Sequence, residues 1–482
     1  MFQGLYNWLK PKGGAKLGYD AAAYSRSRRM RPVSTLSEDK ELRPEHRQLL
    51  VSEARDLQRN FTLAGFIIRK HLQMVSRFNF ESICKPEKDA TPERKYEIES
   101  FNIALENKIK QWSKRHNCDI AQRHCLSELL EIIETHRVID GDCGVLKVSG
   151  GRLQIIEGDC IRNPIAAEWS GSIPQYPDYE WVHGVKVGRT GRAFKYALNR
   201  RMPEGGFQFE REVSSDNLYL TGYFTRSNQI RGISKLAPAI TFFSHLYEGI
   251  DYALAKAKLS QLLGIFTTHK EDEFDAESAD EMPGVEDMRR ELMSKFGPEV
   301  AHITGRTGDT LELIANNTPS NEFQNFCVMT IRLVFAALDI PYAYFDGSVA
   351  TYYGNEMSIN DYVESSQQKQ TDLVELLEEL TDWRLREWVA SGELLLPSYW
   401  TVEDVQYEWI GATLPPWILI KNVKEYLTAV ACGFVSPVNI CKQHRSNVWR
   451  NLEDMQEVFA YAKELGLNLA IDQDKGFTQI GA

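Results

Sequence analysis

The amino-acid sequence predicts a mainly helical α+β protein of several domains. Its 482 residues exceed what one hydrophobic core organises, so about two to four domains are expected. Apolar residues make up 43% and charged residues 26%, the balance of an ordinary folded protein. Apolar positions recur at steps of three and four along most of the chain, whereas two shorter stretches alternate with a period of two.

Charge and cysteine content narrow the functional class. The formal net charge of −11 argues against a protein that wraps nucleic acid by neutralising its phosphates, because that mode needs a basic surface. An acidic wall still suits a conduit, in which tight phosphate contacts would stall a moving duplex. The eight cysteines include no Cys-x-x-Cys pair and predict reduced thiols. Neither a signal peptide nor a membrane span is expected, which predicts a cytoplasmic protein.

The N-terminal part predicts an arm followed by helices. Residues 1–44 are rich in Gly, Pro, Ser and Arg, and we expect an extended arm there. It is either a solvated tail or an arm that reaches a neighbouring subunit or nucleic acid. Helices then dominate up to residue 137. Thr91-Pro92 predicts the start of one amphipathic helix, and Leu126 and Ile133 lie on the apolar face of the next.

The middle of the chain turns from strands back to helix. Residues 145–156 and 185–198 alternate around glycine-containing turns and predict two β-hairpins. Residues 233–266 are helical again, and Pro238 and Gly249 predict two pieces rather than one rod. An acidic stretch at 270–281 is too charged for a core.

The C-terminal part predicts more helices. Residues 321–338 form one, and a loop of Gly, Ser, Tyr, Thr and Asn follows at 344–360. A long helix over 361–391 ends at Gly392. Residues 417–470 predict a compact helical hairpin or bundle.

Common catalytic motifs are missing. A motor that used ATP would need a glycine-rich loop ending in Lys and Ser or Thr, and Gly305–Thr310 lacks the lysine. Neither Gly-x-Ser-x-Gly nor His-Glu-x-x-His occurs. The sequence therefore predicts no enzyme and no cofactor.

Two clusters of possible metal ligands have simpler interpretations. The spacing of the first differs from paired zinc ligands, which favours a helical surface with incidental side chains; its members are His116, Cys118, His124 and Cys125. Asp140, Asp142 and Glu157 are an acid/base or metal candidate, but Asp-Gly-Asp before a strand is typical of a turn.

Several short segments follow one another in a distinctive order. They include Ala54-Arg55-Asp56-Leu57-Gln58-Arg59-Asn60, Arg137-Val138-Ile139-Asp140-Gly141-Asp142, Gln229-Ile230-Arg231-Gly232 and Leu338-Asp339-Ile340-Pro341-Tyr342. In number and order these segments resemble the lambda-type portal proteins of tailed phages over nearly the whole chain. One departure is Thr351–Ser358, where the family usually has an Asn-Tyr-Ser-Ser-type sequence.

The resemblance implies a ring, typically of twelve subunits, with wing, stem, clip and crown regions around an axial channel. Mapped onto this chain, the regions are the arm (1–44), a helical then β-rich wing (45–235), a first stem helix (236–266), a mixed clip module (267–320), a second stem helix (321–343), a channel loop (344–360), a long wing helix with a following strand (361–416) and a helical crown (417–482).

The resemblance also implies sites and partners. Structural roles fall to the motif residues Arg55, Arg59, Asn60, Gln229, Arg231, Gly232 and Pro341. Double-stranded DNA would pass without sequence-specific contact, touching Thr351, Tyr352, Tyr353 and Asn355 in the channel loop and the stem residues Lys256, Lys258 and Lys270. The acidic residues Glu271, Asp272 and Glu273 would meet the motor at the clip or line the channel.

Further expected partners are the terminase large subunit, the major capsid and scaffolding proteins, and head-completion or adaptor proteins. The expected location is the portal vertex of the virion, after assembly in the host bacterial cytoplasm. Two alternatives stay open at this point. One is a soluble phage enzyme with a metal at Asp140, Asp142 and Glu157, and the other is a minor capsid or adaptor subunit.

Overall fold

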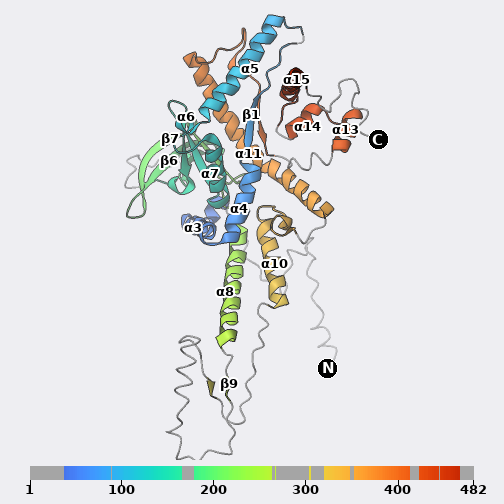
Figure 1. Cartoon of the computed structure of the whole chain (residues 1–482). Helices are drawn as coiled ribbons and strands as arrows, with labels where there is room; N and C mark the ends of the chain where they lie inside the picture. Colours follow the sequence, from blue (N-terminus) through green and yellow to red (C-terminus); the bar gives the residue numbers. More distant parts are fainter. Residues whose placement is uncertain are drawn as a thin grey trace, which may run out of the picture.

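The computed structural model describes residues 37–87, 89–164, 179–262, 266–267, 303–304, 320–347, 352–412, 423–443 and 446–466. Within these ranges the chain mixes helices with small antiparallel sheets, which confirms the predicted α+β class. A helical body carries a β-rich lobe on one side, and helix α8 runs away from the body (Figure 1). No helix in the described part combines the length and apolarity needed to cross a bilayer.

The first core holds the long helices of the body together. It joins α5 (Pro92–Trp112), α7 (Leu126–Ile139) and α11 (Tyr352–Ser391). Thr91 caps α5 as predicted, because its side chain accepts a hydrogen bond from the backbone N–H of Arg94.

Strand β1 (Phe78–Ser82) lies between helices, and the sequence did not indicate it. It pairs antiparallel with β11 (Tyr407–Gly411), so that Phe78 lies opposite Gly411. This pairing ties the start of the chain to a segment more than 300 residues later, and its aromatic residues extend the first core.

Two sheets build the β-rich lobe. The first has the order β3-β2-β8 and contains β2 (Asp142–Val148), β3 (Arg152–Glu157) and β8 (Leu218–Gly222). The second has the order β4-β5-β6-β7 and contains β4 (Tyr179–Val182), β5 (Val185–Gly188), β6 (Ala193–Arg201) and β7 (Phe207–Ser214). The β2–β3 and β5–β6 hairpins confirm the two predicted ones.

A second core joins the N-terminal helices to two later ones. It contains α3 (Pro44–Asn60), α4 (Thr62–Val75), α8 (Ile240–Leu262) and α10 (Asn321–Ala336). Phe243 near the start of α8 is fully buried, whereas Tyr252 further along is 74% exposed. Pro238 lies in a separate short turn, η3 (Ala237–Ala239), as predicted, but Gly249 does not interrupt α8.

Two predicted boundaries were wrong. Helix α11 begins at Tyr352, so the second part of the predicted loop 344–360 is helical. The reason is tertiary packing: Ile359, Tyr362 and Val363 are buried, and the Tyr362 ring meets that of Tyr344 at 5.4 Å.

At the other boundary, the end of the predicted arm contains α2 (Glu38–Glu41) and the first residue of α3. Asp39 fixes this turn, because its carboxylate accepts a hydrogen bond from the backbone N–H of Ile230.

The C-terminal segment is helical, as its sequence predicts, and its described residues (423–443 and 446–466) form three helices. They are α13 (Val423–Ala431), α14 (Pro437–Gln443) and α15 (Val448–Glu464). Gly466 follows α15 with a φ of 70°, the left-handed conformation expected at a helix end. Most of the predicted clip module, residues 268–302 and 305–319, lies outside the described residues. The described parts near it include the short strands β9 (Phe266–Thr267) and β10 (Ile303–Thr304), which pair in parallel.

Candidate functional site

Charged residues from five separate segments converge where α3 meets the β-rich lobe. We call this group the junction; its members are the carboxylates Asp140, Asp142, Glu157 and Asp159 and the arginines Arg47, Arg55, Arg201 and Arg231. The arginines come from α3, from the end of β6 and from the loop before η3. The carboxylates come from the α7–β2 turn and from the end of β3. The junction therefore connects the helical body to both sheets.

At the centre of the junction, Asp142 and Arg231 form a buried ion pair. Arg231 Nε and Nη2 donate to the two carboxylate oxygens of Asp142, each over 2.8 Å, and both side chains are at most 1% exposed. The remaining N–H groups of Arg231 donate to the backbone carbonyls of Ile161, His183 and Gly158. A buried charge is stable only when it is paired and fully hydrogen-bonded, and this arrangement meets both conditions.

The backbone around this pair leaves no room for side chains. A Cβ added at Gly232 would lie 2.1 Å from the carbonyl oxygen of Gly141, and Gly141 itself has a φ of 94°. Gln229 supports the same loop, because its amide donates to the carbonyl of Arg231 over 2.8 Å and its oxygen accepts from the backbone N–H of Thr225. These contacts explain the Gln-x-Arg-Gly sequence noted above.

Electrostatics keep Asp142 ionised. Burial alone would raise the pKa of its carboxyl group, but the charges of Arg231 and Arg47 and a hydrogen bond from the Gly232 N–H lower the pKa to about 2. Arg47 Nη2 donates to the Asp142 carboxylate over 2.8 Å, and Arg47 Nη1 donates to the Gly232 carbonyl over 3.1 Å.

Around Arg55, three carboxylates meet. Its Nη2 lies 2.6 Å from Asp140 and 3.0 Å from Glu157, and its Nη1 lies 2.8 Å from Asp159. Arg201 also reaches the last two. Burial opposes ionisation of Asp140, yet hydrogen bonds from His136 and Arg55 hold its pKa below the ordinary value.

This cluster bears on the metal hypothesis. Among the described residues, Asp140, Glu157 and Asp159 are the three possible ligands whose oxygens lie within 4.8 Å of one another. The cation they face is the Arg55 guanidinium. Asp142, the third member of the candidate set, points to Arg231 instead. The geometry is that of a structural ion network, with each carboxylate already paired.

The zinc candidates do not assemble. The Cys118 thiol is buried and donates to the carbonyls of Ser113 and His124, and burial raises its pKa to about 12. His124 instead approaches Glu128 at 3.8 Å. A neutral, buried thiol fits the predicted structural role.

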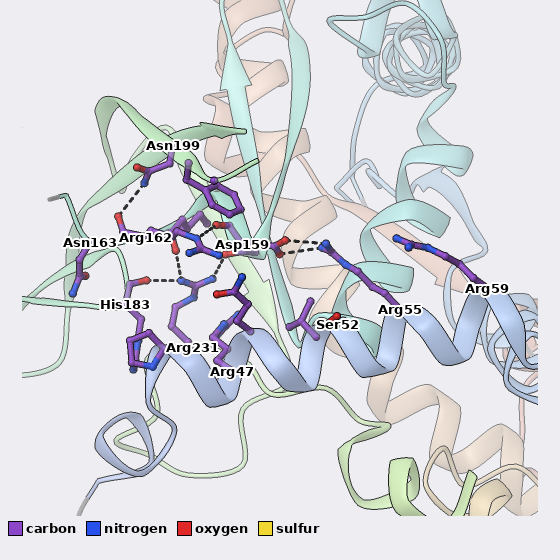
Figure 2. A pocket seen from close by; sticks show the side chains of 17 residues that line it. Arg47, Ser52, Arg55, Arg59, Asp159, Arg162, Asn163, His183, Asn199 and Arg231 are labelled. Carbon is purple, nitrogen blue, oxygen red and sulfur yellow. Dashed lines mark hydrogen bonds and ion pairs between the residues drawn. The ribbon is translucent and has the colours of Figure 1, made fainter. Parts of the chain in front are cut away.

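A cavity of about 630 Å³ opens beside the junction, between α3 and the β-rich lobe (Figure 2). The residues that line it include Arg47, Gln48, Val51, Arg55, Arg59, Asp159, Ile161, Arg162, Asn163, His183, Asn199, Phe207 and Arg231. Arginine dominates the charge of this lining.

The other predicted site residues lie elsewhere. Lys256 and Lys258 are exposed on the far half of α8, and Tyr352, Tyr353 and Asn355 lie at the start of α11. Asn60 donates to Asp56 on the surface of α3, and Pro341 precedes a short turn at Tyr342–Tyr344. Five predicted residues lie outside the described part of the chain: Lys270, Glu271, Asp272, Glu273 and Thr351.

Two arginines of the junction could not be predicted from the sequence. Arg47 and Arg201 carried no signal, because their carboxylate partners are about 40 to 95 residues away. A second buried network was also missed: Glu134 accepts hydrogen bonds from Arg137 and Tyr223 and lies 2.7 Å from His71 Nε2. Helix α7 also carries Glu128, Glu131 and His136, so the charges of Glu134 and Arg137 did not stand out in the sequence.

Comparisons with known proteins agree on one family. Residues 25–370 match the model of the family described as phage portal protein, lambda family. A probable portal protein of Halomonas phage phiHAP-1 is 25% identical over 262 residues, which cover 51% of this chain. The match spans 48% of that relative, about half of its length.

Solved structures are more distant. The neck of an empty GTA particle, computed with C6 symmetry, is 14% identical with a TM-score of 0.46, covering 80% of this chain and 92% of that one. A chain from the virion of a native gene transfer agent (GTA) particle is 14% identical with a TM-score of 0.42, covering 81% and 91%.

Proposed function

Because the chain belongs to the lambda family of phage portal proteins, we propose that copies of it close into a ring at one capsid vertex. The ring is the channel through which DNA enters during packaging and leaves during ejection. It acts as a structural subunit without catalysis of its own, sits in the virion, and seeds capsid assembly in the host cytoplasm. We propose twelve copies in the ring.

The main observation behind this proposal is the exposed apolar surface of helices α8 and α10. The two helices pack against each other through the second core and leave large apolar side chains in water. On α8 these are Phe242, Tyr247, Ile250, Tyr252 and Leu254, and on α10 they are Phe326, Met329 and Leu333, each at least 38% exposed. Large exposed apolar side chains on two neighbouring helices are typical of a protein interface. Side-by-side packing of copies would cover it.

The projecting position of α8 supports its assignment as a stem helix (Figure 1). We assign residues 236–266 and 321–343 to the stem, with the clip at 267–320 between them. Residues 45–235 and 361–416 form the wing, and the helices α13 to α15 belong to the crown at 417–482.

DNA would pass along the stem without sequence-specific contacts. Lys256 and Lys258 are exposed on α8 and offer sparse phosphate contacts. The start of α11, with Tyr352, Tyr353 and Asn355, takes the place of the expected channel loop. A net charge of −11 leaves the chain acidic overall, which suits a channel through which a DNA duplex must slide.

Energy for packaging would come from a separate terminase ATPase docked at the clip, whose contact we place at Glu271–Glu273. The upper faces of the ring would meet the major capsid and scaffolding proteins and, later, head-completion or adaptor proteins. The junction serves this role mechanically, because it fixes the β-rich lobe to the helical body.

The test is the particle mass of the purified chain and of two matched variants. Leu333→Glu places a charge on the exposed α10 face, and Leu395→Glu does the same at an 81% exposed position away from that face. We expect native electrophoresis and negative-stain images to show rings for the unchanged chain and for Leu395→Glu, and subunits for Leu333→Glu. Rings that survive Leu333→Glu, or subunits that never assemble, would contradict the proposal.

A further inference from the structure

The cavity beside the junction carries more positive than negative charge. Among the lining residues that the structure describes, five are arginines and one, Asp159, is a carboxylate. The junction uses three of these arginines, Arg47, Arg55 and Arg231, in ion pairs with buried or half-buried carboxylates. Arg59 and Arg162 are left as cations that the junction does not neutralise.

Two contacts hold the Arg162 side chain in place. Its guanidinium stacks on the ring of Phe207 at 3.7 Å, and its Nε donates to the backbone carbonyl of Asp159 over 2.7 Å. No acceptor among the described residues pairs with its two Nη groups. Stacking therefore fixes the plane of the guanidinium while its outer edge stays open, the geometry that suits a bidentate carboxylate.

The surroundings of Arg162 are unfavourable to its charge. Burial and the nearby Arg201 and Arg231 lower its pKa, although Asp159 acts in the opposite direction. Arg47 shows the same effect, from burial and from Arg231. An anion in the cavity would offset this crowding of like charges.

Arg59 supplies a second open cation. It lies on α3 one turn after Arg55, its side chain is exposed, and no described carboxylate forms an ion pair with it. Figure 2 shows Arg55 and Arg59 leaving the same side of α3, with Arg162 on the other side of Asp159 from them. The two open cations thus lie toward different ends of one cavity.

The uncharged residues of the lining indicate the chemistry of the part of a ligand that would connect its two anionic groups. Gln48, Asn163 and Asn199 are carboxamides, whereas Val51 and Ile161 are apolar. Asn163 Oδ1 already accepts from the Gly184 N–H and Asn199 Nδ2 already donates to the Arg162 carbonyl, so that Asn163 offers its amide N–H groups and Asn199 its carbonyl oxygen. A phosphate chain needs only donors, but peptide groups need both, and a volume of about 630 Å³ far exceeds one small anion. We propose that this cavity binds an acidic segment of a partner polypeptide, whose carboxylates pair with Arg162 and Arg59.

The proposal is tested by binding to the full-length purified chain, and it does not depend on ring formation. The probe is a fluorescently labelled peptide of ten glutamates, followed by anisotropy at low ionic strength. We expect binding that weakens as salt is added. We expect Arg162→Gln and Arg59→Gln each to weaken it about tenfold, because each removes a charge-assisted hydrogen bond.

Arg200→Gln is the matched control, since Arg200 is exposed on β6 and does not line the cavity. Its affinity should stay within about twofold of the unchanged chain. Arg59 is on the surface, so its variant reports on binding even where Arg162→Gln perturbs the fold. Equal weakening by all three variants, or no binding at all, would overturn the proposal. Competition by inorganic triphosphate at far lower concentration than by unlabelled peptide would also overturn it and assign a phosphate ligand.

Discussion

The ion pair between Arg231 and Asp142 gives the sharpest expectation for stability. In the variant Arg231→Met, an apolar side chain of similar length replaces the guanidinium, and Asp142 loses two hydrogen bonds. The carbonyls of Ile161, His183 and Gly158 lose their donor as well. Asp142 then stays fully buried with fewer partners, whereas the three carbonyls belong to residues that line the cavity.

Removing one partner of a buried ion pair typically costs ~3–5 kcal/mol, because the other charge stays buried. Arg47 and the Gly232 N–H still contact Asp142, which argues for the lower end of that range. The three carbonyls add to the cost, because an unmade hydrogen bond costs ~1–3 kcal/mol wherever water does not replace the lost donor. We therefore expect a loss of about 4 kcal/mol, a large part of the ~5–15 kcal/mol that stabilises a domain.

The assay is urea unfolding followed by tryptophan fluorescence, with hydrogen exchange at the amides of β2 and β8 to assign the loss to the junction. Arg226→Met is the matched control, because Arg226 lies in the same loop, is half exposed and forms one surface ion pair with Glu38. That pair should contribute less than ~1 kcal/mol. If Arg231→Met lost no more than Arg226→Met, the pair would not stabilise the fold as we argue.

Three further outcomes follow from the same structure. Gly232→Ala should lower the free energy of unfolding by about 2 kcal/mol or more, because the new Cβ would lie 2.1 Å from a carbonyl oxygen, whereas Gly347→Ala meets nothing within 4 Å and should be neutral in thermal unfolding. The pKa of Asp142 is about 2 in the fold against ~3.9 in the unfolded chain, which stabilises the protein above pH 4 by ~2–3 kcal/mol. This stabilisation is lost as the pH falls from about 4 to about 2, and Asp142→Asn should remove that part of the acid dependence in unfolding titrations. Leu376→Ala should cost ~2–5 kcal/mol in urea unfolding because Leu376 is fully buried, and the 81% exposed Leu395→Ala should change it by less than ~0.5 kcal/mol.

Local pattern predicted the elements whose signals are local. The β2–β3 hairpin follows from alternation around Gly150 and Gly151, both of which adopt positive φ in the structure. The end of α11 at Gly392 has the same kind of cause, since its φ of 75° favours glycine.

Elements that depend on distant partners could not be predicted in this way. Strand β1 is five residues long and forms because β11 lies beside it, more than 300 residues later in the chain. The start of α11 reads as a loop in composition, yet buried Tyr362 and Ile359 hold it helical. In both cases tertiary packing outweighs local propensity.

The ion pairs of the junction also depend on distant parts of the chain and could not be predicted from local sequence patterns. Asp140, Asp142 and Glu157 stood out as an acidic cluster, but the sequence offered no means of knowing that Arg55 and Arg231 would meet them. Ion pairs between segments about 90 residues apart leave no periodic pattern. Resemblance to the family identified Arg55 and Arg231, and the geometry then supplied the physical reason for them.

The central claim is that copies of this chain surround a hole through which double-stranded DNA passes. An averaged image of the assembled particle, viewed along its axis, tests it most directly. We predict a closed ring with an axial opening, a mass of about twelve times the 55.2 kDa subunit, and α8 and α10 projecting around the opening. A particle without an axial opening, or one in which the exposed faces of α8 and α10 lie on the outside of the assembly and contact no neighbouring copy, would contradict it.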